Sequence, residues 1–288
     1  MKTLSECLAE AREKNIAIGH FNFANIEMFW AIVRAAQKTG QPVILGVAEG
    51  ERDFVGIPQA VALVETARKD SSVPLFLNAD HTYSVERVKE AIGAGFDAVI
   101  FDGAKLPFEE NLSKMKECVE YAKKSGKNVL VEGEVGYIGQ SSQVREALPE
   151  GAAIRPEDLT TPEDAVRFVH ETGVDLFAPA VGNIHGMFAD APDPALDISR
   201  IKEISDATGI PLVLHGASGN TDDDMRSAIK AGIRIIHIST EMRRADRSAL
   251  EKSLADNPNE VAPYKLMKPV VEAVEAVVEN KIKLFAGI

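Results

Sequence analysis

Three histidines follow short apolar segments of the kind that form buried strands. His81, His185 and His215 lie in LFLNADHT, APAVGNIHG and LVLHGASG. If these segments are parallel strands of one barrel, their carboxyl ends meet and the three imidazoles face one mouth. Three neutral imidazoles bind a divalent ion and leave coordination positions open, as a catalytic metal site requires. A single histidine is more often a satisfied core or surface group, so the prediction depends on all three converging.

Carboxylates follow the same kind of segment. Asp80 precedes His81, Asp102 ends VIFD, and Glu132 and Glu134 lie in LVEGEVG. Because strand side chains alternate between faces, Glu132 and Glu134 share a face and can both point into a barrel. The same alternation predicts that Asp80 points away from the side of His81, or to the rim. We expect the other carboxylates to form a second, weaker metal position or to support the histidines, with helix capping or ion pairing as the alternative.

A loop of small residues suits a phosphate group. The run HGASG begins at His215 and precedes an expected helix. Backbone N–H groups at a helix start bind anions, and barrels of parallel strands often hold phosphate after their last two strands. The final strand segment, IIHISTEMR, adds His237, Ser239 and Thr240. Ser239 or Thr240 could instead cap the following helix, and the two uses are compatible.

Eight short apolar runs alternate with segments of helical periodicity. Continuous runs such as VILGV and PLVLH are typical of parallel strands buried on both faces. Eight such units favour an α/β fold of one closed TIM (β/α)₈ barrel over an open sheet. We expect the strands at Ile16–Asn22, Pro42–Ala48, Pro74–Asp80, Ala98–Gly103, Asn128–Val135, Leu176–Val181, Pro211–Gly216 and Arg234–Ser239.

The remaining segments add to this barrel without dividing it. Gly136–Thr161 is a long irregular stretch, which is usually functional or disordered in a compact domain. Tyr264–Lys283 is expected to form an additional C-terminal helix. Since no linker interrupts the series, residues 1–288 are predicted to form a single domain.

The composition excludes several classes of function. With 45% hydrophobic and 26% charged residues, the chain is typical of globular proteins. A net charge of −12 argues against binding to nucleic acid or anionic membranes, which requires a surplus of Lys and Arg. No apolar run is long enough for a membrane span and no secretory signal opens the sequence, so we expect a cytoplasmic protein. Cys7 and Cys118 lack metal-binding or redox spacing and are expected to be buried.

Five motifs in a fixed order give the chain a family resemblance. ADH, EGEVG, GNIHG, LHGASG and STE make it resemble the class II fructose-bisphosphate and tagatose-bisphosphate aldolases over nearly its whole length. The resemblance implies a homodimeric or homotetrameric barrel that uses Zn²⁺ or another divalent ion. It also implies reversible cleavage of a ketose phosphate or bisphosphate into dihydroxyacetone phosphate and an aldehyde.

The resemblance also assigns roles to residues. Asp80 matches the family's proton donor. The metal ligands are matched by His81, His185 and His215, and the alternate metal position by Asp102 and Glu134. The dihydroxyacetone-phosphate site is matched by Gly186, Gly216, Ala217, Ser218, His237, Ile238, Ser239 and Thr240.

Four departures from the family pattern concern the substrate. His237 replaces an Asn that touches the triose unit, and Ala48-Glu49-Gly50 replaces Ser-x-Gly. The loop after the fifth strand reads GQSSQVRE, with Glu146 as the nearest candidate for its usual acidic base. The C-terminal Arg element for a distal phosphate is not evident. If His237 faces the pocket, it could become cationic beside a phosphate, and binding would weaken as pH rises through its pKa.

Three other hypotheses are compatible with the sequence. A Schiff-base aldolase needs a desolvated lysine; Lys105, in a loop, is the nearest candidate and fits a surface residue better. A metal-dependent hydrolase could also use a histidine-rich barrel mouth, although the GASG loop favours a phosphate ligand. The third is a catalytically idle barrel that serves as a binding or assembly subunit. Measurements of metal content and of ketose-phosphate cleavage would distinguish these hypotheses.

Overall fold

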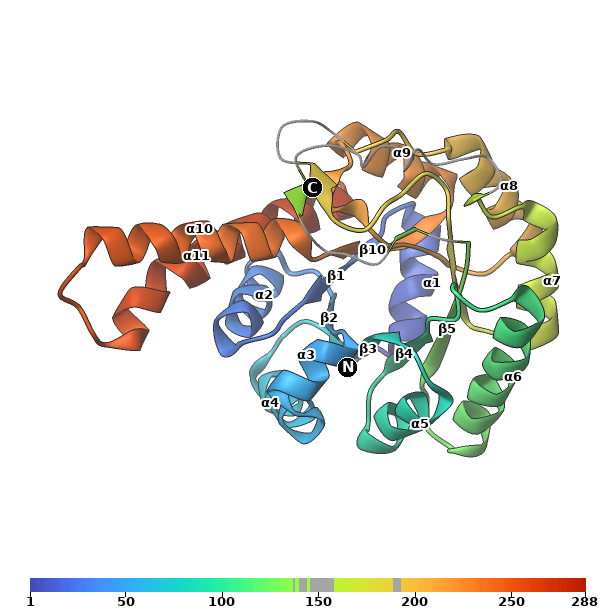
Figure 1. Cartoon of the computed structure of the whole chain (residues 1–288), viewed down its shortest axis with the longest axis horizontal. Coiled ribbons are helices and arrows are strands. Elements are labelled where there is room, and N and C mark those ends of the chain that lie inside the picture. Colours follow the sequence, from blue (N-terminus) through green and yellow to red (C-terminus); the bar gives the residue numbers. More distant parts are fainter. Residues whose placement is uncertain (137, 140–143, 146–157, 189–192) are drawn as a thin grey trace.

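The computed structural model describes residues 1–136, 138–139, 144–145, 158–188 and 193–288. Eight parallel strands close into a barrel in the order β1-β10-β9-β7-β5-β4-β3-β2, which confirms the predicted fold (Figure 1). Each strand lies within its expected range, except that β3 runs two residues past Asp80 and β10 begins one residue before Arg234. The strands are β1 Ile18–Asn22, β2 Val43–Val47, β3 Leu75–Thr82, β4 Ala98–Phe101, β5 Leu130–Val135, β7 Leu176–Pro179, β9 Leu212–Leu214 and β10 Ile233–Ile238.

Helices surround the barrel and cover the outer faces of its strands. Most begin at a side-chain cap; Asn25, for example, accepts a hydrogen bond from the backbone N–H of Met28 and so starts α2. The helices are α1 Leu4–Lys14, α2 Ile26–Thr39, α3 Glu49–Val55, α4 Ile57–Asp70, α5 Val85–Ala94, α6 Phe108–Lys124, α7 Pro162–Thr172, α8 Ile198–Thr208, α9 Asp222–Ala231, α10 Thr240–Asp256 and α11 Pro263–Ala286.

The barrel interior is apolar at one end and polar at the other. The first inward positions of the strands pack against α1, which closes the amino-terminal end; the cluster includes Ile18, Ile44, Phe76 and Ile235 with Leu4, Cys7 and Leu8. Two residues further along the strands, the inward positions become His20, Asn78, Glu132 and His237, all buried. Period-two alternation therefore directs these polar side chains to the closed interior below the carboxyl-terminal mouth.

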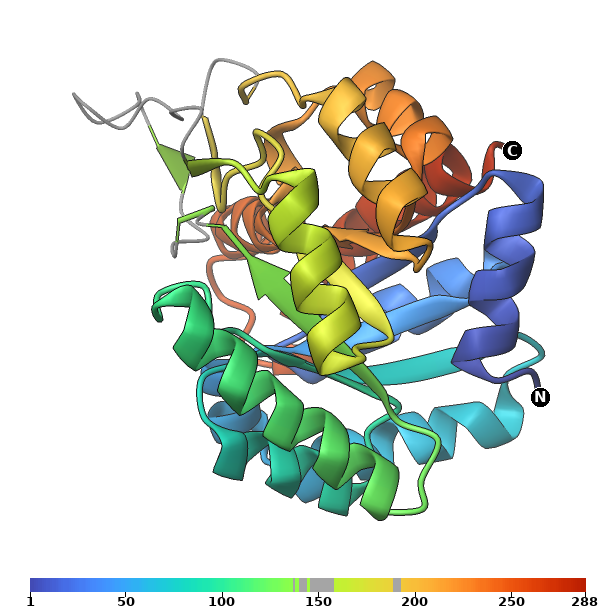
Figure 2. The same ribbon diagram turned by 90° about the vertical axis from the view of Figure 1, so that its right-hand side faces the viewer.

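Two features lie outside the regular barrel. A short parallel pair, β6 (Val144–Arg145) and β8 (Met187–Phe188), connects the loops after β5 and β7 and was not predicted. Figure 2 shows this pair and α1 at opposite ends of the barrel. The predicted C-terminal helix is confirmed as α11, which runs beside α10 and extends with it beyond the barrel (Figure 1). Among the described helices, none has the length and apolar character of a membrane span.

Candidate metal centre

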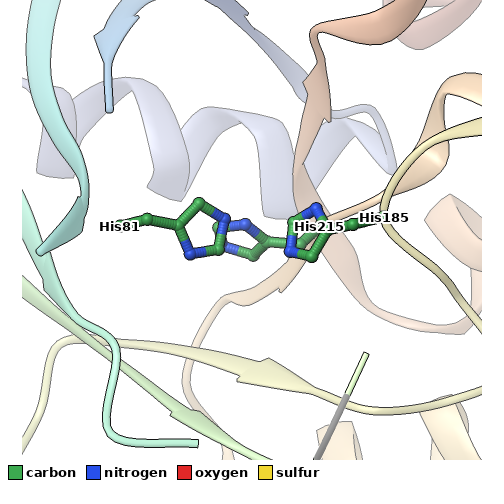
Figure 3. Close-up of side chains that lie close together, drawn as sticks. All are labelled: His81, His185 and His215. Atoms are coloured by element: carbon green, nitrogen blue, oxygen red, sulfur yellow. The ribbon is translucent and has the colours of Figure 1, made fainter. Parts of the chain in front are cut away.

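The three predicted histidines converge at the carboxyl-terminal mouth (Figure 3). His81 lies near the end of β3, His185 in the loop after β7, and His215 directly after β9. One ring nitrogen of each lies within 4.8 Å of one nitrogen of the others. The ring centroid of His81 lies 4.7 Å from that of His185 and 4.8 Å from that of His215. This cluster of imidazoles suits a single divalent ion.

Carboxylates orient two of these rings. Asp102 Oδ2 lies 2.9 Å from Nδ1 of His81, and Glu132 Oε1 lies 2.6 Å from Nε2 of His215. These hydrogen bonds leave Nε2 of His81 and Nδ1 of His215 for the centre. Nδ1 of His215 is buried and has no hydrogen-bond partner among the described residues. A carboxylate on one ring nitrogen and a metal on the other is the usual arrangement of metal-binding histidines, so the residues fit the ion.

The electrostatics of the three rings differ. Burial disfavours the charged form of His81, but Asp80, Asp102 and Glu134 outweigh it and raise its pKa to about 10. Burial and the charge on His81 lower the pKa of His215 to about 3. The pKa of His185 is also well below its usual value, for the same two reasons. His81 is therefore the ring from which an ion must displace a proton, since only the neutral imidazole binds metal.

An irregular backbone at His81 brings two neighbouring side chains to the same site. His81 has φ +35°, in the left-handed region, and the β3–β4 register shifts between Ala79 and Thr82. This conformation costs a residue with a side chain roughly 1–3 kcal/mol. The expectation that Asp80 would point away was wrong: Asp80 follows the inward alternation and is 4% exposed. His81 is the residue that departs from the alternation, so both face the interior.

Asp80 lies beneath the three-histidine cluster in a polar environment. Its Oδ2 accepts a hydrogen bond of 2.9 Å from Nδ2 of Asn22, and its Oδ1 lies 3.5 Å from Nδ1 of His237 and 4.0 Å from Nε2 of His81. Burial opposes ionisation of this carboxyl, but His81 and His237 hold its pKa well below the usual value. An ionised carboxylate beside the candidate centre can accept a proton.

Sequence reasoning missed a polar layer under Asp80. The ring of His20 stacks on that of His237 at a centroid distance of 3.5 Å and an interplanar angle of 6°. Nε2 of His20 lies 3.1 Å from Nδ2 of Asn78. Gly46 makes room for this pair, because a Cβ there would lie 2.1 Å from Cε1 of His20. The alternation that pairs Glu132 with Glu134 would also have placed His20 and Asn22 inside.

His237 faces the interior, but not as a cation. It lines the cleft at the mouth together with Ala48, Gly186 and Thr240. Burial and the neighbouring His215 lower the pKa of His237 to about 4. Without a ligand His237 is therefore neutral and offers one hydrogen-bond donor and one acceptor. The expectation that it becomes cationic concerns the phosphate-bound protein and stays a prediction.

A second missed group, Glu51, lies beside Ala48 at the rim of the cleft. Glu51 Oε2 accepts hydrogen bonds from Nδ2 of Asn22 at 2.9 Å and from the backbone N–H of Ala48 at 2.7 Å. Its Oε1 accepts one of 2.6 Å from Nη2 of Arg243, which also lines the cleft. Glu51 thus links the rim of the cleft to Asn22, the donor to Asp80.

The predicted phosphate loop lies against the start of α10. Gly216 has φ +64°, and a Cβ there would lie 2.4 Å from the carbonyl oxygen of Ile184, so only glycine fits. Ser218 Oγ lies 3.2 Å from the backbone N of Ser239 and 3.1 Å from that of Thr240. Ser218 therefore caps α10. Ser239, one of the two caps that the sequence offers, occupies the N-cap position without a side-chain cap bond.

The remaining predicted residues lie in different places. Glu132 and Glu134 both face the interior, as expected; burial raises the pKa of Glu132 to about 7, and burial with Asp102 raises that of Glu134 well above its usual value. His81, Asp102 and Glu134 form a second group with ligand atoms close together. Ala217 and Ile238 are buried beside the cleft, and Lys105 is exposed. Glu146 lies outside the described residues.

Comparisons with known proteins identify a common family. The family model "Fructose-bisphosphate aldolase class-II" matches residues 2–287. Fructose-bisphosphate aldolase of Staphylococcus aureus (strain Mu50) is 36% identical over 286 residues, covering 98% of this chain and 96% of the relative. The crystal structure of the YdjI aldolase from Escherichia coli K12 superposes with a TM-score of 0.81 at 32% identity, covering 97% of this chain and 95% of that chain. Fructose-bisphosphate aldolase from Campylobacter jejuni, at 19% identity and a TM-score of 0.80, shares the fold over 98% of this chain and 93% of its own.

Proposed function

The chain belongs to the class II fructose-bisphosphate aldolase family and is an aldolase, and on this premise we propose that it cleaves a ketose phosphate or bisphosphate with a divalent metal ion. The products would be dihydroxyacetone phosphate and an aldehyde. The observation that carries the proposal is the convergence of three imidazoles, two of them oriented by carboxylates, next to Asp80.

We assign the ion, Zn²⁺ or a similar cation, to His81, His185 and His215. When bound, it supplies Lewis-acid stabilisation of the negative charge that develops as an aldol carbon–carbon bond breaks. Asn183 supports the ligand set from the protein side, because its Nδ2 donates a hydrogen bond of 2.9 Å to the carbonyl of His215. Asp102 and Glu134 are proposed to offer an alternate position for the ion.

Asp80 is the proposed proton-transfer residue. Its carboxylate would accept the proton of the hydroxyl on the carbon that becomes the aldehyde, and return it in the reverse reaction. The hydrogen bond from Asn22 orients Oδ2, while Oδ1 has no hydrogen-bond partner within the described part of the chain. We therefore propose Oδ1 as the oxygen that accepts the proton.

The triose phosphate is proposed to bind across the mouth, between the loops after β7, β9 and β10. Gly186, Gly216 and Ser218 line the cleft, and the start of α10 is nearby. Helix N-termini favour anions, which suits the phosphate. His237 would contact the triose unit as a neutral imidazole, beside Ser239 and Thr240. These loops adjoin the proposed metal ligands, so phosphate binding would place the ketone near the ion.

We propose that the enzyme is a homodimer or homotetramer. An apolar groove of about 560 Å³ lies on the outer side of α2, α3 and α4. Ile26, Trp30 and Phe54 line it and are exposed by 50%, 39% and 80%. Exposed apolar patches of this kind often mark protein interfaces.

The direct test is an assay of ketose phosphates with and without metal. The protein would be stripped with a chelator, reconstituted with Zn²⁺, Co²⁺ or Mn²⁺, and assayed with a coupled triose-phosphate detector. We expect activity to disappear on chelation, to return with one ion per chain, and to be absent from a variant lacking the three imidazoles. Full metal occupancy in that variant would refute the ligand assignment. Phosphate release without a triose would favour the hydrolase alternative, and metal binding without turnover of any substrate would favour an idle subunit.

A further inference from the structure

We propose that Arg52, a buried side chain of α3, is a positioning residue that holds the end of β3 so that Asp80 and His81 face the interior together. This inference rests on the proposed function, because it concerns His81, one of the proposed metal ligands. Arg52 is 1% exposed, which is unusual for an arginine. It lies four residues after the Ala48 that lines the cleft.

The guanidinium of Arg52 binds both sides of His81. Nη1 donates to the carbonyl of Asp80 at 2.9 Å, and Nη2 donates to Oγ1 of Thr82 at 2.9 Å. Nη1 also donates to the carbonyl of Val47, the last residue of β2, at 2.7 Å. The residues immediately before and after His81 are therefore tied to one rigid group.

This group acts where the sheet stops determining the backbone. The β2–β3 ladder ends at the Val47–Ala79 pair, and the β3–β4 register shifts between Ala79 and Thr82. His81, with φ +35°, lies inside that interval. A conformation that side chains rarely adopt persists only when its surroundings determine it. In this segment the bonds from Arg52 supply that constraint on the side of β2.

The chemistry of the position requires arginine rather than another donor. The planar guanidinium presents several N–H groups in fixed directions, so one side chain can bind two carbonyls and a hydroxyl at once. Burial of a charged group is unfavourable unless it is paired and hydrogen-bonded. Asp80 and Glu49 provide negative charge near the guanidinium, with Glu49 Oε2 at 3.9 Å from Nη2. A side chain that served packing alone would not need this charge.

Arg234 offers a matched control at the other end of the barrel. It is also buried, at 6% exposure, and its Nη1 donates to the carbonyls of Ile229 and Ile233 at 2.7 Å. It lies at the start of β10, away from the mouth. Loss of the Arg234 side chain should lower the folding stability, as loss of any buried arginine does, without changing the positions of the three histidines.

The experiment measures Co²⁺ binding to the full-length protein by the visible absorption bands of the bound ion. We expect Arg52→Met to reduce Co²⁺ affinity roughly 10–100-fold, the usual scale for groups that orient metal ligands, and to alter the absorption bands. Arg52→Lys, which keeps the charge but not the fork, should give a smaller loss. Arg234→Met should keep the affinity and spectrum of the unchanged protein. Should Arg52→Met not fold, Thr82→Val removes one acceptor of the guanidinium with little change in volume and should also weaken Co²⁺ binding.

The possible results separate this inference from the proposed function. If Arg52→Met folds and keeps the Co²⁺ affinity and spectrum of the unchanged protein, the role of Arg52 is overturned and the metal assignment is unaffected. The same result in Thr82→Val overturns it if Arg52→Met does not fold. Equal losses in Arg52→Met and Arg234→Met would also overturn it, because they would reflect stability alone. Failure of the unchanged protein to bind Co²⁺ would overturn the metal assignment and this inference together.

Discussion

His81 is the residue where protons and metal ions compete most directly. Three carboxylates surround it and raise its pKa to about 10, whereas His185 and His215 are held neutral. The carboxylates that favour a metal cation also favour the imidazolium. The same electrostatic attraction therefore supports metal binding and opposes it at lower pH.

Metal affinity should rise with pH because of His81. Below a pKa of about 10 the ring is protonated, so binding at pH 7 releases one proton. The association constant for Zn²⁺ should then increase about tenfold per pH unit between pH 7 and 9, since one bound proton is exchanged. Calorimetry in buffers of different ionisation enthalpy measures both quantities. Asp102→Asn removes one of the carboxylates and should weaken the dependence; an affinity that is constant across this range would contradict the assignment.

Asp80 should be required for turnover but not for metal binding. Asp80→Ala removes the proposed base while leaving the three imidazoles, so kcat should fall by roughly two to four orders of magnitude. Metal content, measured by elemental analysis, should stay at one ion per chain. Near-normal cleavage by this variant would exclude Asp80 from proton transfer, and loss of the ion would instead assign it to the ligand set.

Residue types and strand positions were sufficient to predict the histidines of this site and the carboxylates beside them, but not the contacts of Glu51 and Arg52. Each of the three histidines follows an apolar segment, and this pattern is visible in the sequence. Glu51 and Arg52 belong to a short helix after β2, and their contacts depend on how that helix turns over the barrel mouth. Such long-range contacts have no periodic signal.

At the scale of elements, the strands were predictable because each combines an apolar core with polar boundaries. The irregularity at the end of β3 was not, since alternation rules assume regular backbone and His81 departs from it. The β6–β8 pair was missed for a different reason. It consists of two residues per strand, too few for any periodicity to appear.

The start of α10 depends on a side chain from another element. Ser218, in the loop after β9, accepts from backbone N–H groups at this helix start. Ser218→Ala should lower the free energy of unfolding by roughly 0.5–2 kcal/mol, as the loss of a helix cap does. Ser239→Ala is the control and should have little effect on stability, because its hydroxyl makes no cap bond. Urea denaturation measures both, and equal losses would contradict the capping role of Ser218.

At the scale of the whole molecule, the closed barrel followed from the count of eight strand–helix units. The placement of α10 and α11 beyond the barrel did not, because the sequence predicts a helix but not what it packs against. Several exposed apolar residues lie near the tip of this pair: Leu254, Val261 and Tyr264. Together with the groove beside Phe54, they leave apolar surface on two parts of the chain.

We expect copies of the chain to associate through the apolar groove on α2, α3 and α4. This contact would stabilise α3 and, through α3, the metal centre. This helix carries Arg52 and Glu51 on its buried side and Phe54, 80% exposed, on its outer side. Light scattering coupled to size exclusion should therefore give a multiple of the 31.1 kDa chain mass. Phe54→Asp should shift the protein toward monomer, because a carboxylate is unfavourable in an apolar interface. Val166→Asp, at a 38% exposed apolar position on α7, is the matched control and should keep the assembly. A monomeric unchanged protein, or an assembly unaffected by Phe54→Asp, would show that this groove is not the interface.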